Sequence, residues 1–153
     1  MSTSKEHRIR LALEALSGFA VLIGLVFLGL QLRQNTAAIQ AATFQDLVHT
    51  SSQFNVAIAT NPVVRGVYLA GWQNPEGFDE SEREVWLLLQ SAYWARMQNV
   101  FFQYQRGTLT EADWQAYRVN ICGSAVSPGG NAHWRSDGIL TPLFKDFLES
   151  CGN

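Results

Sequence analysis

The sequence predicts an all-α fold, in which a single N-terminal transmembrane helix continues into a small extramembrane helical bundle. Three observations support this prediction. Sixteen residues from Ala15 to Leu30 carry no charge and no proline. Later segments repeat apolar residues at helical spacing, and no strand-length stretch of alternating apolar and polar residues stands out. With 153 residues, the chain has room for one anchor and one small domain.

The apolar segment is long enough to cross a membrane. With Gln31 and Leu32 it gives a helix of about 27 Å at ~1.5 Å per residue, close to the roughly 30 Å of the hydrocarbon layer. A cleaved export signal and the core helix of a soluble protein are the alternatives. A cut after Ala42 would leave Gln40 at the −3 position, which suits signal cleavage poorly. A soluble core helix would usually keep a polar face, so we expect an uncleaved anchor.

The distribution of charge predicts the orientation of this anchor. Residues 1–33 hold four basic and two acidic residues, a net charge of +2, whereas residues 34–153 hold seven basic and eleven acidic residues, a net charge of −4. Lys5, Arg8 and Arg10 precede the apolar segment, and cytoplasmic flanks are enriched in basic residues. We therefore expect a single-pass protein with a cytoplasmic N-terminus and with its C-terminal domain on the outer side of the membrane. In a bacterium with two membranes, this places the anchor in the inner membrane and the domain in the periplasm. The acidic domain argues against nucleic acid as a partner.

The chain is predicted to comprise four parts in order. Residues 1–10 form the cytoplasmic N-terminus, 11–32 the transmembrane helix, 33–61 a stalk helix and 62–153 the helical bundle domain. No glycine or proline interrupts residues 30–61, so anchor and stalk are expected to form one helix over about residues 10–60. The apolar residues that share one face of the outer half are Phe44, Leu47, Val48, Phe54 and Ile58.

Capping signals predict the helices of the bundle. The residues expected to cap or begin these helices are Asn61 with Pro62, Asp79 or Ser81, Thr110, and Thr141 with Pro142. The longest of them should stop at Gly107. Residues 73–80 (QNPEGFDE) are predicted to form a loop, and residues 124–134 (SAVSPGGNAHW) a flexible loop, from their glycine, proline and serine content. The last helix is expected to bury Leu143, Phe144, Phe147 and Leu148.

The longest helix of the bundle is apolar over more than half of its circumference. Its broad stripe comprises Val85, Leu88, Leu89, Ala92, Tyr93, Met97, Val100 and Tyr104, widened by Trp86, Trp94 and Phe101. We expect such a helix to be the central element of the bundle rather than part of a second interface. Arg96, Asn99 and Gln103 lie among the rings. They are either buried with acidic or carbonyl partners or mark the solvent side.

Three phrases of the sequence are distinctive: FLGLQLRQNT (27–36), GVYLAGWQNPEGFDESE (66–82) and NVFFQYQRGTLTEADW (99–114). Together they resemble a family of bacterial membrane-anchored proteins of unknown function. The resemblance covers roughly residues 15–120. It implies an N-terminal anchor and a helical body in bacteria, and it implies no activity, cofactor or catalytic residue.

The sequence offers few groups for catalysis or metal binding. The three histidines stand far apart at positions 7, 49 and 133, without an HExxH or CxxC motif. His133 and Asp137 are four residues apart, a spacing that fits a solvated pair better than a site. We expect no catalytic, cofactor or metal site and no enzymatic activity. Cys122 and Cys151 would form a disulfide in an oxidising compartment, the alternative being two buried free thiols.

Two features remain that could act through contact. Ala20 and Gly24 form a small-xxx-small pair that lets a second helix approach closely. The four candidate aromatic residues for an interface or a pocket are Trp86, Tyr93, Trp94 and Trp114.

These features predict a non-enzymatic, membrane-anchored interaction or structural protein. It would contact membrane lipid and either self-assemble as a homo-oligomer or serve as an accessory subunit of a larger membrane protein complex. The alternative is a periplasmic sensor module that binds a small molecule or lipid. A cavity lined by the four aromatic residues would favour binding, whereas a dry core with an exposed, ring-rich face would favour assembly.

Overall fold

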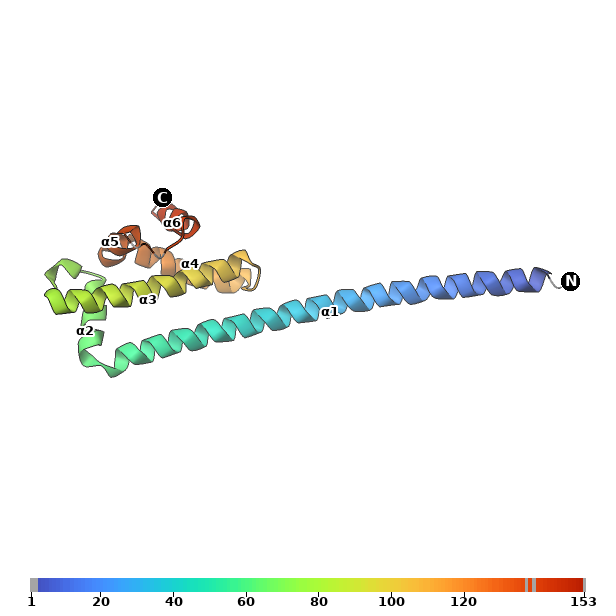
Figure 1. The fold of residues 1–153 in the computed structure, drawn as a ribbon, viewed down its shortest axis with the longest axis horizontal. Helices are drawn as coiled ribbons and strands as arrows, with labels where there is room; N and C mark the ends of the chain where they lie inside the picture. Colours follow the sequence, from blue (N-terminus) through green and yellow to red (C-terminus); the bar gives the residue numbers. More distant parts are fainter. Residues whose placement is uncertain (1–2, 137, 139, 153) are drawn as a thin grey trace. The chain divides into compact units, whose positions relative to one another are not determined.

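The computed structural model describes residues 3–136, 138 and 140–152, apart from the side chains of residues 3–6, 8, 9, 11, 12 and 15. The residues so described form six α-helices and one short 3₁₀ helix, without a β-strand (Figure 1). The predicted all-α fold class is confirmed. The chain divides into two compact units, Met1–Ile39 and Gln40–Asn153.

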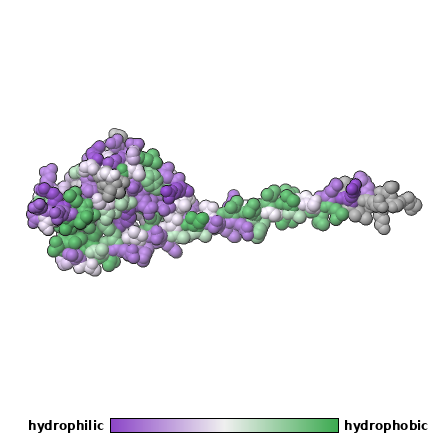
Figure 2. Space-filling model, viewed as in Figure 1, coloured by the Kyte–Doolittle hydropathy of each residue, from purple (hydrophilic) through white to green (hydrophobic). Residues whose placement is uncertain are grey.

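Helix α1 (Thr3–Thr60) runs through both the predicted anchor and the predicted stalk. Its continuity follows from the sequence, since residues 30–60 lack the glycine and proline that interrupt helices. Within the described residues, one segment of α1, beginning at Leu16, is long and apolar enough to cross a membrane, and its most apolar window is fully exposed (Figure 2). The described part of the first unit is therefore a single helix with an exposed apolar segment.

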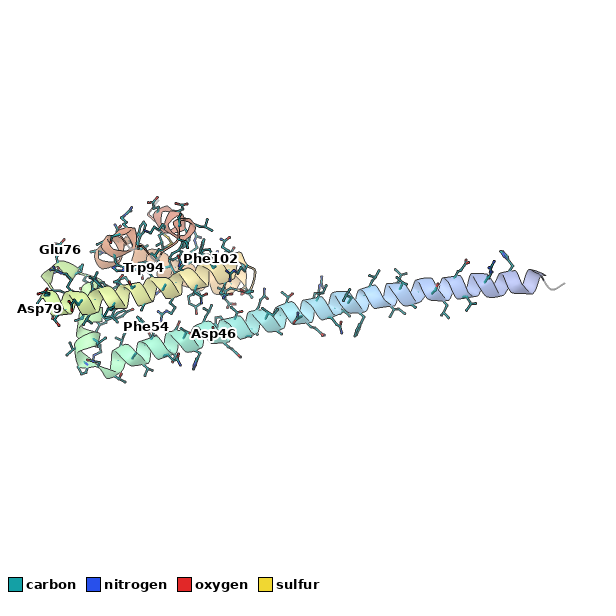
Figure 3. The ribbon with its side chains drawn as sticks, viewed as in Figure 1. Asp46, Phe54, Glu76, Asp79, Trp94 and Phe102 are labelled. Atoms are coloured by element: carbon teal, nitrogen blue, oxygen red, sulfur yellow. A yellow bond between two sulfur atoms is a disulfide. The ribbon has the colours of Figure 1, made fainter. Side chains whose placement is uncertain are left out.

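The second unit begins within α1, so residues 40–60 of the predicted stalk group with the helical domain. Leu47 and Ile58 from this stretch are buried. Figure 3 shows Phe54 on the side of α1 that faces α3. Phe44 and Val48 are exposed instead, because only the residues nearest the neighbouring helices can be covered.

Helix α2 (Pro62–Gly71) begins where the sequence predicts. The Asn61 side chain accepts hydrogen bonds from the backbone N–H groups of Val63 and Val64, which satisfies two of the free donors at a helix start. Pro62 occupies the first turn, where its missing N–H costs nothing. The predicted loop that follows contains a 3₁₀ turn, η1 (Pro75–Gly77).

Helix α3 (Glu80–Gln105) is the longest helix that lies wholly within the second unit, and it contacts α2, α4 and α5. Asp79 and Glu82 form a reciprocal capping box at its start. The chain leaves the helix through Gly107, whose φ of 73° suits glycine.

The buried face of α3 differs from the predicted stripe. Leu88 and Ala92 are exposed, Leu88 by 73%, although both were expected to be covered. The residues that are buried are Trp86, Gln90, Tyr93, Trp94, Met97, Val100 and Phe101. With more than half of the circumference apolar, periodicity alone could not fix which side faces the neighbouring helices.

Helix α4 (Glu111–Val126) is capped by Thr110, as the sequence predicts. The prediction of a flexible loop over residues 124–134 is wrong: α4 continues to Val126, and Pro128–Ser136 form helix α5. Pro128 begins α5, where its fixed φ favours a helix start.

The glycines of this segment serve close packing. A Cβ added to Gly129 would overlap the carbonyl oxygen of Gly71 and meet the Trp86 ring. A Cβ added to Gly130 would overlap the carbonyl oxygen of Ser124. Two backbones approach here as only glycine allows, which explains how a glycine-rich stretch can form part of a helix.

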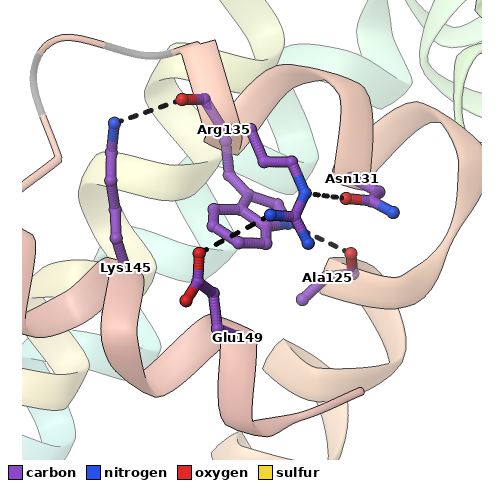
Figure 4. Close-up of polar contacts among 6 residues, drawn as sticks. Ala125, Asn131, Arg135, Lys145 and Glu149 are labelled. Carbon is purple, nitrogen blue, oxygen red and sulfur yellow. Dashed lines mark hydrogen bonds and ion pairs between the residues drawn. The ribbon is translucent and has the colours of Figure 1, made fainter.

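Helix α6 (Pro142–Ser150) completes the domain. It buries Phe144 and Leu148, whereas Leu143 is exposed, contrary to prediction. Its polar side contacts α5: the Arg135 guanidinium lies 3.6 Å from the Glu149 carboxylate, and the Lys145 ammonium donates to the Arg135 carbonyl oxygen (Figure 4). Such exposed pairs contribute little, so the apolar contacts hold α6. Asp137, the predicted partner of His133, lies outside the described residues.

Candidate ligand-binding site

The four candidate aromatic residues do not surround one shared cavity. Tyr93, Trp94 and Trp114 belong to the same packed core, and Trp94 is completely covered. Figure 3 shows Trp94 on the side of α3 that faces the C-terminal helices. The Trp86 ring instead packs edge-on against Trp72, with ring centres 5.4 Å apart. Trp94 and Trp114 therefore act as core. Trp86 lines a smaller pocket of about 300 Å³, and Tyr93 is the one of the four rings that reaches the larger pocket described next.

A pocket of about 540 Å³ lies inside the second unit, between residues 40–60 of α1 and helices α2, α3 and α4. Its size falls within the range of small-molecule sites. The lining residues are Phe44, Ser51, Asn55, Tyr68, Tyr93, Arg96, Met97, Ala112, Asp113, Ala116, Tyr117 and Asn120. The lining is mixed: four of these residues are apolar, and the other eight carry a hydroxyl, amide or charged group.

Helical periodicity brings the lining residues together. Tyr93 and Met97 stand one turn apart on α3, with Arg96 beside them. Ala112 and Ala116 stand one turn apart on α4. Because an alanine side chain is a single methyl group, this pair leaves space where larger residues would fill the gap between helices.

Arg96 is the most unusual group in the pocket. The centre of its guanidinium lies 4.4 Å from the centroid of the Phe54 ring and 5.8 Å from that of Tyr93, a cation–π arrangement. Its Nε and Nη1 atoms are buried and have no hydrogen-bond partner among the described residues. Burial lowers the pKa of Arg96 below its usual value. The pocket therefore contains a cation with unused donors, a costly arrangement without a ligand.

Asn99 and Gln103 are the other two polar residues that the sequence places among the rings of α3, and their surroundings differ from those of Arg96. Asn99 is exposed, and its side-chain oxygen accepts a hydrogen bond of 3.4 Å from the Gln103 amide. The sequence left two interpretations of Arg96, Asn99 and Gln103, burial with partners or exposure on the solvent side, and each applies to some of these residues. Asn99 marks the outer side of the helix. Gln103 is half-buried, and its side-chain oxygen accepts a hydrogen bond from the Thr108 hydroxyl. Arg96 is also half-buried, but it lacks the expected acidic or carbonyl partner in the described structure.

Asp113 places a carboxylate in the same lining. It lies in the first turn of α4, where its backbone N–H donates to the Thr110 hydroxyl oxygen at 3.2 Å and its Oδ2 accepts from the Thr110 hydroxyl. A helix N-terminus stabilises a negative charge. The pocket thus contains one basic and one acidic side chain.

Tyr93 connects the pocket to the core. Its hydroxyl lies 2.9 Å from Asn120 Oδ1, to which it donates, and 2.7 Å from the Ser124 hydroxyl. Burial raises the pKa of Tyr93 to about 12, an effect that the Ser124 hydrogen bond opposes. The hydroxyl therefore stays protonated at neutral pH and remains a hydrogen-bond donor.

The raised pKa of Tyr93 predicts a loss of stability in alkali. Below pH 10 the phenol is protonated in both states, and its contribution to stability is complete; between pH 10 and about 12 only the unfolded chain releases the proton. The free energy of unfolding should therefore fall across this interval. We expect Tyr93→Phe to show a smaller fall in denaturant titrations at stepped pH. Parallel curves for the two proteins would contradict the prediction.

The two cysteines are joined in the structure. A disulfide links Cys122 on α4 to Cys151 at the end of α6, with Cα atoms 5.1 Å apart and 29 residues of sequence separation. It ties the last helix to the body of the domain. The predicted pairing, rather than two free thiols, is therefore present. Among the described residues, no group of three or more potential metal ligands comes together.

Ala20 and Gly24 lie on the exposed surface of the first unit. A Cβ added to Gly24 would meet nothing within 4 Å. This part of α1 is therefore open to contact with lipid or with another helix.

Comparison with known proteins leaves the pocket to be interpreted from its own chemistry. No protein-family model, curated protein or solved structure matches this chain. The likeness to bacterial membrane-anchored proteins stays a prediction drawn from the three sequence phrases.

Proposed function

We propose that this chain is a non-enzymatic, single-pass membrane protein whose helical domain binds a small molecule or lipid. The observation that carries the proposal is the pocket of about 540 Å³ with the unpaired donors of Arg96 in its wall. A ligand that accepts hydrogen bonds from this guanidinium would offset the cost of burying it. The assembly hypothesis called for an exposed, ring-rich face. The large apolar residues exposed in the described part of the domain are mainly aliphatic, with Phe44 as the aromatic member.

The proposed location is the inner membrane of a bacterium, with the N-terminus in the cytoplasm and the domain in the periplasm. The apolar segment of α1 supports an anchor, and the basic residues before it support this orientation. The Cys122–Cys151 disulfide fits an oxidising compartment.

Native mass spectrometry of the full-length protein tests the proposal. The protein would be transferred from its own membranes into phosphatidylcholine nanodiscs, so that no detergent occupies the pocket. We expect a bound small molecule in the wild type and its loss in Ala116→Trp, which fills the pocket. Ala95→Trp adds the same ring at an exposed position of α3 and should retain the ligand. Absence of a bound species from wild-type protein would contradict the proposal.

A second candidate function is assembly through α1, as a homo-oligomer or within a larger membrane complex. The open surface around Gly24 favours it, because small residues let two membrane helices pack closely. In mild detergent, we expect Gly24→Leu to reduce the native mass of the extracted protein. Gly29→Leu, about 140° around the helix from Gly24 at ~100° per residue, should leave that mass unchanged. A wild-type monomer would contradict the prediction, and comigration with a larger complex would indicate an accessory subunit.

A further inference from the structure

We infer that the pocket selects a monocarboxylate with an apolar or aromatic body, whose carboxylate is held by Arg96. This inference rests on the proposed function, since it names the chemical class of ligand for the same pocket. Its basis is the combination of unpaired guanidinium donors, one carboxylate in the same lining and a patch of apolar and aromatic surface in the wall.

The guanidinium of Arg96 determines the sign of the ligand charge. Its Nε and Nη1 atoms lack partners in the described structure, while its Cζ lies over the Phe54 ring, 4.4 Å from the ring centroid. This contact helps to hold the group in place. Nε and Nη1 belong to two different edges of the guanidinium, and Nη2 completes each edge. A carboxylate matches such an edge with two parallel hydrogen bonds, which a neutral group cannot make with equal strength.

Asp113 limits the amount of negative charge that the pocket can accept. It lines the same space as Arg96, so the two side chains together contribute no net charge. A single carboxylate can pair with Arg96 and remain away from Asp113. A phosphate monoester carries more negative charge and would experience stronger repulsion from Asp113 in a partly desolvated site.

The remaining lining determines the body of the ligand. Phe44 and Met97 provide apolar surface, and the alanine pair of α4 provides space. Tyr68 and Tyr117 add ring surface with hydroxyl groups. An apolar chain or an aromatic ring would gain contact with this part of the wall.

Four ligands that share a phenyl ring and differ in charge test the inference. Hydrocinnamate is a monoanion, hydrocinnamamide is neutral, phenylalanine is a zwitterion and phenethyl phosphate carries more than one negative charge. Calorimetric titration of the full-length protein in phosphatidylcholine nanodiscs, with empty nanodiscs subtracted, gives the affinities. We expect hydrocinnamate to bind about tenfold or more tightly than each of the other three. A titration with decanoate shows whether the natural ligand is a fatty acid or a small aromatic acid. Tighter binding of decanoate than of hydrocinnamate would indicate a fatty acid, and the reverse would indicate an aromatic acid.

Arg96→Gln should weaken hydrocinnamate binding by about tenfold or more while leaving hydrocinnamamide binding unchanged. Arg65→Gln removes the same charge from an exposed position of α2 and should change neither affinity. If Arg96→Gln does not fold, Arg96→Lys serves in its place. Lysine keeps the positive charge but cannot donate two parallel hydrogen bonds. This variant should therefore weaken the binding of hydrocinnamate and leave the binding of hydrocinnamamide unchanged.

The outcomes separate this inference from the proposed function. Equal binding of the acid and the amide, tighter binding of phenylalanine or phenethyl phosphate, or no binding of either monocarboxylate at millimolar concentration would overturn the inference. The proposed function would still stand if the native mass shows a bound molecule that Ala116→Trp removes. If the native mass shows no bound molecule and neither monocarboxylate binds in the calorimetric titration, both proposals are rejected.

Discussion

Replacing Gly129 by alanine should lower the free energy of unfolding by about 3 kcal/mol or more. The added methyl group would overlap the carbonyl oxygen of Gly71 and press on the Trp86 ring, 2.9 Å away. Neither neighbour can move freely, because one is backbone and the other is a buried ring. To accommodate the methyl group, α5 would have to move away from α2 and expose the Trp86 ring. The substitution would therefore weaken the packing between these two helices.

Gly123→Ala is the matched control. Gly123 lies on the exposed side of α4, in its last turn, and a Cβ added there meets nothing within 4 Å. Because alanine favours a helix over glycine, this change should raise the free energy of unfolding by about 0.5–1 kcal/mol. Denaturant unfolding of the full-length variants, followed by tryptophan fluorescence, measures both. Equal midpoints for Gly129→Ala and wild type would show that α5 does not pack on Gly71 as described.

Replacing Cys151 by serine should lower the free energy of unfolding by about 3.5 kcal/mol, the loop-entropy value for a cross-link over this separation. The disulfide closes 29 residues that include all of α5 and α6. The short helix α6 is held otherwise by a few buried residues and exposed polar contacts. Without the cross-link, the C-terminal helices should unfold first.

Reduction of the wild-type protein provides the control for the cysteine variant. A reductant should lower the stability of the wild type to that of Cys151→Ser and should leave the variant unchanged. The double variant Cys122→Ser/Cys151→Ser should equal the single variant. Alkylation should label the wild type only after reduction, and rapid labelling of two thiols in the native, unreduced protein would contradict the pairing.

Local signals predicted most of the helix boundaries. Asn61 with Pro62, the Asp79–Glu82 box and Gly107 each act within a few residues, and their positions in the structure agree with the prediction. The α5 segment was mispredicted because the glycine at position 129 is required by close packing against Gly71, which is far away in the sequence. A glycine that permits a close approach and a glycine that permits a turn look alike in sequence.

The candidate site was predicted only in part. Tyr93 was named, but the wall around it depends on which side of α3 faces α1 and α4. The apolar stripe of α3 covers more than half of the helix and so hides that choice. One available signal was Arg96, a single cation within the aromatic part of the helix. Another was the alanine pair of α4, Ala112 and Ala116, beside Tyr117. Whether small residues make a cavity or simply allow close packing depends on the partner helix.

The disulfide also sets an order of events in the life of the chain. In the proposed topology, Cys122 reaches the oxidising side of the membrane 29 residues ahead of Cys151. During that interval its thiol can react with oxidants, small thiols or other proteins. Completion of the domain therefore depends on how fast translocation delivers the second cysteine, relative to the reactions that would capture the first. A cell that exports this protein slowly, or that lacks thiol–disulfide exchange to reverse such captures, should accumulate chains that reach the membrane but stop short of the mature form.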